Sequence, residues 1–279
     1  MVTFLFWNLN GKALDQEVTQ LCDTHSVDVL VVAEVIGRQA TAIQVKSRET
    51  TIQQSLTSKT GKTYVTEHND FSYRLKFFFR YSSKSISQIE DFYGLSIREI
   101  SLPNSQSMLL AAVHLTSKLH ADNAEQESQT RDIVKRIEAA EEKRGHRRTL
   151  VMGDFNMNPF EGGLVNADAF HGVMSKHIAQ SKSRTVRKTK RYFFYNPMWG
   201  RMGDISEGPP GTYYYKKSTN REVFWNTFDQ LLLRPELLPL FKADKLKVIT
   251  KVGSLSLINK DKVNAKDFSD HLPILIDLS

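Results

Sequence analysis

The segment from Thr149 to Pro159 holds the residues of this chain that are most suited to chemistry. It reads Thr-Leu-Val-Met-Gly-Asp-Phe-Asn-Met-Asn-Pro, an apolar strand that runs into Asp154 and Asn156 and stops at Pro159. Residues two apart in an extended chain project from the same face, so the carboxylate and the amide are expected to lie together. Proline cannot continue a central strand because it donates no backbone hydrogen bond. The segment therefore predicts the edge of a polar site.

Five other apolar segments carry Asn, Asp, Glu or His at or near an end, a repetition that random placement rarely produces. Carboxylates and amides supply the hard oxygen ligands that Mg²⁺ prefers, and imidazole titrates near neutral pH. Together they predict metal-assisted chemistry with proton transfer. The segments are 4–11 with Asn8 and Asn10, 29–34 with Glu34, 110–114 with His114, 227–233 with Asp229, and 268–273 with Asp270 and His271.

Each candidate taken alone also has a plainer interpretation. A carboxylate such as Glu34 is costly at the end of an apolar strand unless a cation compensates it, but it could simply reach water. Asn8 can offer its amide oxygen to a metal, hold Glu34, or form a turn before Gly11. Asp229 can fix the tautomer of His271, as the acid of a catalytic triad does, or be an exposed acid on an edge strand. Their joint occurrence favours the functional interpretation.

Helical and strand patterns alternate along the chain and predict a single domain over residues 1–279. Apolar residues at helical spacing predict a helix at 14–22 before a strand at 27–35, a second helix at about 40–56 and a third at 123–144. A strand is expected at 73–80. The stretch 181–211, rich in basic residues and then Gly and Pro, is expected to be a long surface loop. With 279 residues, 40% of them hydrophobic, the chain can bury a sizeable core.

The motifs, in this order and at this separation, resemble the endonuclease/exonuclease/phosphatase superfamily, the metal-dependent phosphodiesterases and phosphatases related to deoxyribonuclease I. The resemblance covers nearly the whole chain, from Asn8 to the Ser-Asp-His at 269–271, and is most specific in Gly-Asp-x-Asn together with Ser-Asp-His. It implies a four-layer α/β sandwich, two packed mixed β-sheets flanked by helices. It also implies Mg²⁺ as the cofactor, for which Mn²⁺ could substitute.

The resemblance assigns roles to the residues at matching positions. The implied metal ligands are Asn8, Glu34 and Asp270, and the implied catalytic residues are His114, Asp154, Asn156, Asp229 and His271. Asp154 would orient or deprotonate the attacking water, while Asn156 and His114 would donate to phosphoryl oxygens. His271, fixed by Asp229, would be a base or an electrostatic partner. The sequence leaves open whether Asp154 or His271 takes the proton and whether one metal or two bind.

Two departures from the family pattern help to choose a branch. Asn10 stands where abasic-site endonucleases usually carry Asp, and His114 stands where they usually carry Tyr. Histidine at this place is similar to the deoxyribonuclease, sphingomyelinase and inositol-polyphosphate phosphatase branches. The single cysteine, Cys22, excludes an intrachain disulfide, the start lacks the basic region of a signal peptide, and no stretch approaches a membrane span of ~20 apolar residues. We therefore expect a cytoplasmic protein.

Excess positive charge modestly favours a polyanionic partner. The chain has 38 Lys and Arg against 31 Asp and Glu, a net charge of +7. Basic residues beside the aromatic runs 192–195 and 213–215 could pair with phosphates and stack on bases, although a solvated loop over core aromatics is the plainer interpretation. The candidate substrate-binding residues are Asn10, Arg80, Arg187, Lys188, Lys190, Arg191, Lys216 and Lys217.

The leading hypothesis is a magnesium-dependent nuclease that hydrolyses DNA or RNA by attack of water, without a covalent intermediate. Nucleic acid is then the substrate, and no protein partner can be inferred. The nearest alternative is a phosphatase or phosphodiesterase of the same family acting on inositol phosphates or lipid headgroups, which would also attract Lys and Arg. A noncatalytic nucleic-acid-binding scaffold ranks last, because the acids and both histidines are retained. The choice between DNA and RNA, and between endo and exo action, stays open.

Overall fold

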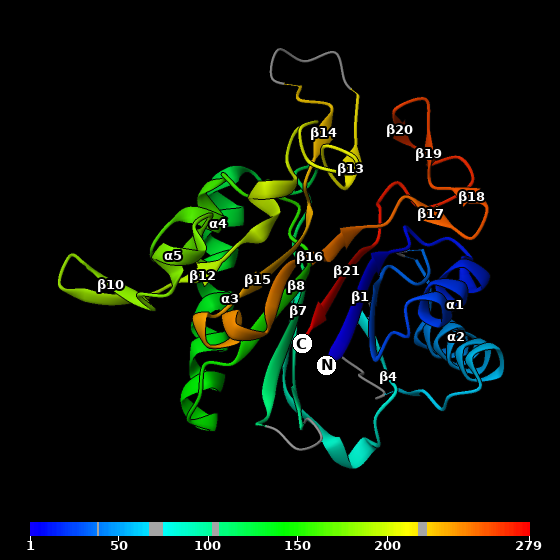
Figure 1. The fold of residues 1–279 in the computed structure, drawn as a ribbon, viewed down its shortest axis with the longest axis horizontal. Helices are drawn as coiled ribbons and strands as arrows, with labels where there is room; N and C mark the ends of the chain where they lie inside the picture. The colour runs from blue at the N-terminus through cyan, green and yellow to red at the C-terminus, as the bar shows by residue number, and fades with distance from the viewer. Residues whose placement is uncertain (38, 67–74, 102–105, 217–221) are drawn as a thin grey trace.

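Two β-sheets packed face to face form the centre of the computed structural model, which describes residues 1–37, 39–66, 75–101, 106–216 and 222–279 (Figure 1). The first sheet has six strands and the second has seven. Both are mixed, since β1 pairs with β2 and β7 with β8 in parallel while most other neighbours are antiparallel. Across the first sheet the order is β16 (Phe241–Val248), β21 (Ile274–Leu278), β1 (Val2–Asn8), β2 (Val29–Ala33), β4 (Leu75–Phe79) and β3 (Val65–Thr66). Across the second it is β5 (Ile86–Phe92), β6 (Leu95–Ile100), β7 (Met108–His114), β8 (Thr149–Asp154), β15 (Asp229–Leu233), β12 (Phe194–Tyr195) and β9 (Gly172–Val173).

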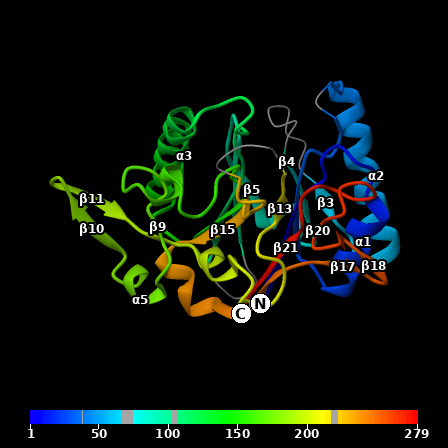
Figure 2. The same ribbon diagram turned by 90° about the horizontal axis from the view of Figure 1, so that it is seen from above.

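Helices cover the outer faces of the two sheets, so the predicted four-layer architecture is confirmed (Figure 2). Helices α1 (Asp15–Thr24) and α2 (Ala42–Thr60) lie on the first sheet, and α3 (Asn123–Arg144) lies on the second. The short helices are α4 (Gly162–Val165), α5 (Lys176–Ala179), η1 (Ser83–Ser85), η2 (Pro197–Arg201) and η3 (Pro235–Leu240). Small two-stranded ribbons are β10 (Ser183–Val186) with β11 (Thr189–Tyr192), β13 (Tyr213–Tyr214) with β14 (Trp225–Asn226), β17 (Lys251–Val252) with β18 (Leu255–Ser256), and β19 (Ile258–Asn259) with β20 (Lys262–Val263).

Alternation of side chains along the central strands creates three buried layers. In β1, Phe4 and Phe6 point into the core between the sheets, while Leu5 and Trp7 point outward against the helices. The same parity holds in the second sheet, where Leu110 of β7 lies in the central core. Strands buried on both faces read as continuous apolar runs, which is why the sequence pattern located them.

The helix boundaries follow from capping signals. The predicted helix at 123–144 is confirmed: the side chain of Asp122 accepts from the backbone N–H of Glu125, Glu125 reciprocates, and Gly145 ends the helix in a left-handed conformation. Thr41 forms the same capping box at α2, so this helix begins at Ala42, and it runs to Thr60 before the left-handed Gly61, further than expected. No helix in the described part of the chain has the length and apolar character needed to cross a membrane.

Two sequence-based expectations about local structure are wrong. The stretch 181–211 is not a loop throughout: it contains β10, β11, η2 and β12, and the last of these joins the second sheet. Exposed, charged strands bury no face, so they lack the alternation that identifies strands. Asn156 does not share an extended face with Asp154, because the strand ends at Asp154 and Asn156 has a φ of 50°.

Candidate active site

The predicted catalytic residues lie where the inner faces of the two sheets open to solvent at one end of the sandwich. Asn8 continues the inward-facing series of Phe4 and Phe6, and Asp154 continues that of β8. The two side chains meet across the gap between the sheets, with the amide Nδ2 of Asn8 donating to Oδ2 of Asp154 at 3.0 Å. Because side chains alternate between the two faces of a strand, polar groups from opposite sheets are placed in contact at the end of the core.

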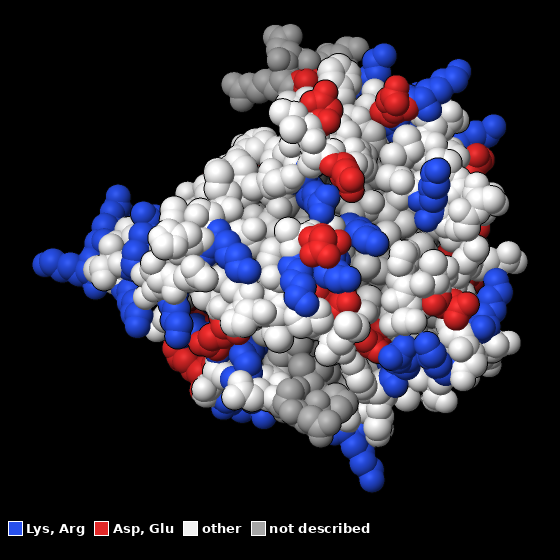
Figure 3. Space-filling view, in the orientation of Figure 1, with Lys and Arg blue, Asp and Glu red and all other residues white. Residues whose placement is uncertain are grey.

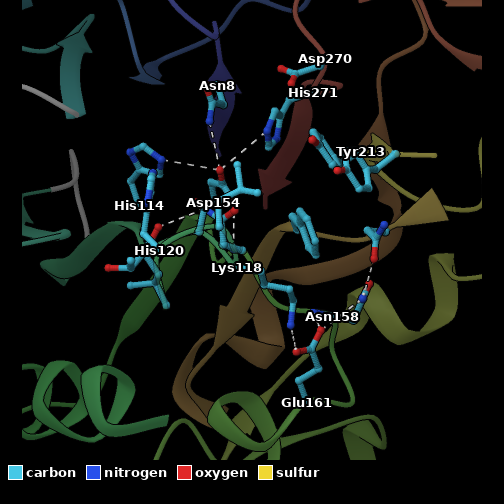
Figure 4. Close-up of a pocket in the computed structure, with 18 of the residues that line it drawn as sticks. Asn8, His114, Lys118, His120, Asp154, Asn158, Glu161, Tyr213, Asp270 and His271 are labelled. Carbon is cyan, nitrogen blue, oxygen red and sulfur yellow. Dashed lines mark hydrogen bonds and ion pairs between the residues drawn. The ribbon is translucent and has the colours of Figure 1, made fainter. Parts of the chain in front are cut away.

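Oδ2 of Asp154 is the centre of the site (Figure 4). Besides Asn8, it lies 3.7 Å from Nε2 of His114 and 3.9 Å from Nε2 of His271. Its partner oxygen, Oδ1, accepts from the backbone N–H of Asn156 at 2.9 Å, which holds the carboxylate in one orientation. The Asp154 side chain is almost fully buried, yet it faces the cavity, so a bound substrate would meet a fixed, acceptor-only group.

Asp229 and His271 form a buried pair beside this centre. Nδ1 of His271 lies 3.0 and 2.9 Å from the two carboxylate oxygens of Asp229, so Nδ1 carries a proton and Nε2 points at Asp154. Burial alone would lower the pKa of His271, but the charges of Asp229 and then Asp154 outweigh it and raise the pKa to about 10. Burial raises the pKa of Asp229 as well. The raised pKa of His271 favours its imidazolium form, with Asp229 bound at Nδ1.

The Ser-Asp-His motif also has a positioning part that the sequence did not reveal. The hydroxyl of Ser269 donates to the backbone carbonyl of Asn8 at 2.6 Å and accepts from the backbone N–H of His271 at 3.1 Å. Nε1 of Trp7 donates to the carbonyl of His271 at 2.9 Å. These bonds tie the final loop to the end of β1, so the orientation of His271 depends on the first strand.

Glu34 follows β2 and reaches the second sheet. Its Oε1 lies 3.2 Å from Nε2 of His114, a second polar contact between the sheets. Glu34 has a φ of 47°, a left-handed conformation that is uncommon for a residue other than glycine. Strain of this kind is typical of functional sites, where the surrounding structure enforces it.

The oxygen donors around the cavity fit a hard divalent cation. Glu34, Asp154 and Asp270 supply carboxylates and Asn8 supplies an amide, all of them lining the same cavity. Oδ1 of Asp270 is buried without a hydrogen-bond partner among the described groups, an arrangement that a cation would satisfy. Asp154, Asp229 and His271 also present ligand atoms within 4.8 Å of one another, but Asp229 already engages Nδ1 of His271. Asn8, Glu34 and Asp270 stay the expected ligands.

The pattern of the whole chain identifies the family. The sequence model of the Endonuclease/Exonuclease/phosphatase family matches residues 5–271 of this chain. The chain belongs to this family. Its members are divalent-metal-dependent hydrolases of phosphate esters, and the chain is a phosphodiesterase of this general class. Comparison with curated protein sequences gave no match.

Solved structures show the same fold at low sequence identity. An endonuclease/exonuclease/phosphatase family protein from Leptotrichia buccalis is 14% identical with a TM-score of 0.58, and the match covers 100% of both chains. The catalytic domain of human Nocturnin with bound sulfate anion is 14% identical with a TM-score of 0.56, covering 100% of this chain and 94% of that one. Humanized D. rerio TDP2 is 16% identical with a TM-score of 0.55, covering 99% and 97%. These likenesses concern the fold alone.

A cavity of about 850 Å³ surrounds the candidate catalytic residues of this family member. Apart from the polar residues already described, aromatic rings form much of its wall. Tyr213 stacks on Phe228 with 5.2 Å between ring centroids and on Tyr215 with 6.3 Å, and it lies 4.7 Å from the ring of His271. The rings of this ladder are Tyr215, Tyr213 and Phe228. From the sequence, the aromatic run 213–215 is interpreted either as a base-stacking surface or as core aromatics under a loop; Tyr213 and Tyr215 line the cavity.

The cavity wall has little positive charge. Lys118 is the single Lys or Arg among the described residues that line it, and Lys118 forms an ion pair with Glu161. Neither residue was anticipated from the sequence, because the loop after His114 carries no motif. Asn158, also in the wall, donates through Nδ2 to Oδ1 of Asn226 at 2.9 Å and accepts from the backbone of Thr227. The predicted basic rim is thus absent from the described wall.

Two predicted substrate-contacting groups do lie in the cavity. Asn10 lines it, with its backbone N–H bonded to Oδ1 of Asn8 at 3.0 Å. Asn156 lines it as well, although its Nδ2 donates to the carbonyl of Leu115 at 3.0 Å, so its amide also anchors the chain after β7. These bonds order the floor of the cavity.

The other predicted substrate-binding residues are not brought to the cavity. Arg80 pairs with Asp28 at the opposite end of the first sheet, because β4 runs antiparallel to β2 and Phe79 faces Val29. Lys216 is exposed outside the cavity wall, and Lys217 lies outside the described residues. The remaining four are on β11 and on the turn that precedes it, and none lines the cavity: Arg187, Lys188, Lys190 and Arg191.

Proposed function

We propose that this phosphodiesterase is a magnesium-dependent nuclease that hydrolyses DNA or RNA. The observation that carries the proposal is the wall of the cavity, where a ladder of aromatic rings is accompanied by one Lys or Arg among the described lining residues, Lys118, which is paired with Glu161. A polynucleotide strand offers one phosphodiester flanked by flat bases that stack on such rings. An inositol polyphosphate or lipid headgroup offers several phosphates, each of which needs Lys or Arg. The wall suits the first substrate better.

In the proposed reaction, Asp154 receives the proton of the attacking water. Its Oδ2 faces the cavity and is held in place by Asn8 and by the backbone of Asn156. His271, kept protonated by Asp229, and His114 then donate hydrogen bonds to the phosphoryl oxygens as charge develops there. A divalent cation held by Asn8, Glu34 and Asp270 would neutralise the phosphoryl group. As the water oxygen bonds to phosphorus, the P–O bond to the leaving sugar oxygen breaks and that oxygen takes a proton from solvent, so no covalent intermediate forms.

Nucleic acid is present in two solved structures of the same fold. One is D. rerio TDP2 complexed with single strand DNA product, 16% identical with a TM-score of 0.52, and the other is the Neisseria 3′ phosphatase NExo bound to product DNA hairpin, 12% identical with a TM-score of 0.51. They support nucleic acid as the substrate class. A cytoplasmic location and a single domain over residues 1–279 stay predictions.

A substrate panel tests the proposal directly. End-labelled single- and double-stranded DNA and RNA and an inositol hexakisphosphate are each incubated with the protein and with Glu34→Gln, in Mg²⁺, Mn²⁺ or EDTA. We expect cleavage of a polynucleotide that requires the metal and is reduced in Glu34→Gln by at least about 100-fold, because a carboxylate ligand is lost. Phosphate release from the inositol compound without strand cleavage would contradict the proposal.

The exposed ring of the ladder gives a second prediction. Tyr215→Ala is expected to raise the KM for a single-stranded oligonucleotide about tenfold with little change in kcat, since base stacking is worth ~1–3 kcal/mol. Phe92→Ala is the matched control, because Phe92 has the same 38% exposure and lies outside the cavity wall. Steady-state kinetics of Tyr215→Ala and Phe92→Ala would distinguish the loss of a ring that lines the cavity from the loss of an equally exposed ring elsewhere. An unchanged KM in Tyr215→Ala would show that the ring ladder does not hold the substrate.

A further inference from the structure

Residues 182–191, here called the basic arm, form a hairpin that projects from the body of the molecule (Figure 1). The arm carries six Lys or Arg residues, and no Asp or Glu occurs between Asp168 and Asp204. Figure 3 shows basic side chains gathered along it. Within the described part of the chain, none of the six forms an ion pair with an acid. They are Lys182, Arg184, Arg187, Lys188, Lys190 and Arg191.

The residues of the arm are unfavourable for a β-hairpin at its turn and across its strands. Its two-residue turn consists of Arg187 and Lys188, with φ values of 46° and 65°. A turn with positive φ at both positions favours Asn-Gly, and larger side chains are disfavoured there. Arg184 also stands directly opposite Arg191 across the ladder, a like-charge pair that destabilises a hairpin. Stability alone does not account for cations at these positions.

The base of the arm is nevertheless held firmly. Nε of Arg184 donates to Nε2 of His171 at 2.9 Å, and Nδ1 of His171 donates to the carbonyl of Tyr192. The guanidinium of Arg147 covers the ring of Tyr192 at 3.6 Å from its centroid. The guanidinium of Arg234 donates to the carbonyl of Phe193 at 3.2 Å. A rigid base keeps the charged tip at a fixed place relative to the body.

We propose that the basic arm binds the sugar-phosphate backbone of a nucleic acid outside the catalytic cavity. This inference rests on the proposed function and extends it. The described cavity wall offers only Lys118 to phosphates, so the remaining phosphates of a long strand require cations elsewhere, and the arm supplies them. Val186 is the single aliphatic residue of the arm, which therefore lacks the apolar side chains with which a membrane-binding hairpin enters lipid.

The test removes the charge of the tip without weakening its turn. Arg187→Asn with Lys188→Gly introduces the residues that this turn prefers, and Lys46→Gln with Lys59→Gln removes two exposed lysines of α2 as the matched control. Binding to a fluorescein-labelled 40-nucleotide single strand of DNA is measured by anisotropy in EDTA, so no cleavage is needed. We expect the tip variant to bind about tenfold more weakly, with a salt slope smaller by about 1.4, and the control to match wild type.

Hydrolysis of a hexanucleotide by the same variants reports on the cavity separately. The inference predicts equal kcat/KM for wild type and the tip variant, because so short a strand need not reach the arm. Unchanged 40-mer affinity and salt slope in the tip variant would overturn the inference. Binding to phosphatidylserine vesicles is measured with the same variants, and a tip variant that loses binding to the vesicles but not to the 40-mer would overturn it as well. If the wild type binds the 40-mer through the tip but cleaves no polynucleotide in Mg²⁺, the arm stands and the proposed nuclease function fails.

Discussion

Replacing Asp154 with Asn is expected to lower kcat about 1,000-fold while the fold is retained. Asn keeps the size of the side chain and can still accept from the backbone N–H of Asn156 through its carbonyl oxygen. It cannot receive a proton from water, and general base catalysis is worth roughly 10²–10⁴-fold. The substitution also turns a carboxylate facing two imidazoles into a neutral group. Steady-state kinetics on the preferred substrate would measure the loss.

Asp132→Asn provides the control for this substitution, because Asp132 is an exposed acid on α3 whose described ion pair is with Lys135. Its kcat is expected to equal that of wild type. Thermal unfolding of both variants would separate chemistry from folding. A kcat for Asp154→Asn within tenfold of wild type would mean that another group takes the proton.

The family resemblance in the sequence was sufficient to predict the two-sheet architecture, and the strand patterns marked the polar residues that the fold brings together around Asp154. Strands buried on both faces leave long apolar runs, and the polar residue that ends each run marks the edge of the core. Asn8 and Asp154 meet because both continue the inward-facing parity of their strands. Which residues of a strand share a face is a local property, so it can be predicted from the sequence without knowing the tertiary structure.

Contacts that depend on tertiary arrangement could not be predicted in this way. Arg80 follows an apolar strand just as Glu34 does, but the two strands are antiparallel, so the residues lie at opposite ends of the sheet. The left-handed conformations of Glu34 and Asn156 are enforced by surrounding packing and leave no compositional signal. The position of the ring ladder in the cavity could not be predicted, because it depends on the contact of Tyr213 with His271, which lies 58 positions later in the chain.

Gly153→Ala is expected to destabilise the protein by more than about 4 kcal/mol, which is exceptional for one methyl group. Gly153 has a φ of 152°, a conformation that residues with a side chain rarely adopt. A Cβ at this position would lie 1.9 Å from the carbonyl oxygen of Val113, its partner in the parallel pairing of β7 with β8. Backbone atoms cannot rotate away, so the two central strands would have to separate. Urea denaturation would measure the loss.

Separating β7 from β8 would also move the catalytic centre, since His114 and Asp154 are the next paired residues along the same two strands. The glycine of the Gly-Asp-x-Asn motif therefore sets the distance between an imidazole and a carboxylate rather than taking part in chemistry. Gly200→Ala is the control, because a Cβ there meets no atom within 4 Å, and its effect should stay within about 0.5 kcal/mol. A Gly153→Ala protein as stable and as active as Gly200→Ala would show that the strand pair can absorb a methyl group, and that this spacing does not govern the site.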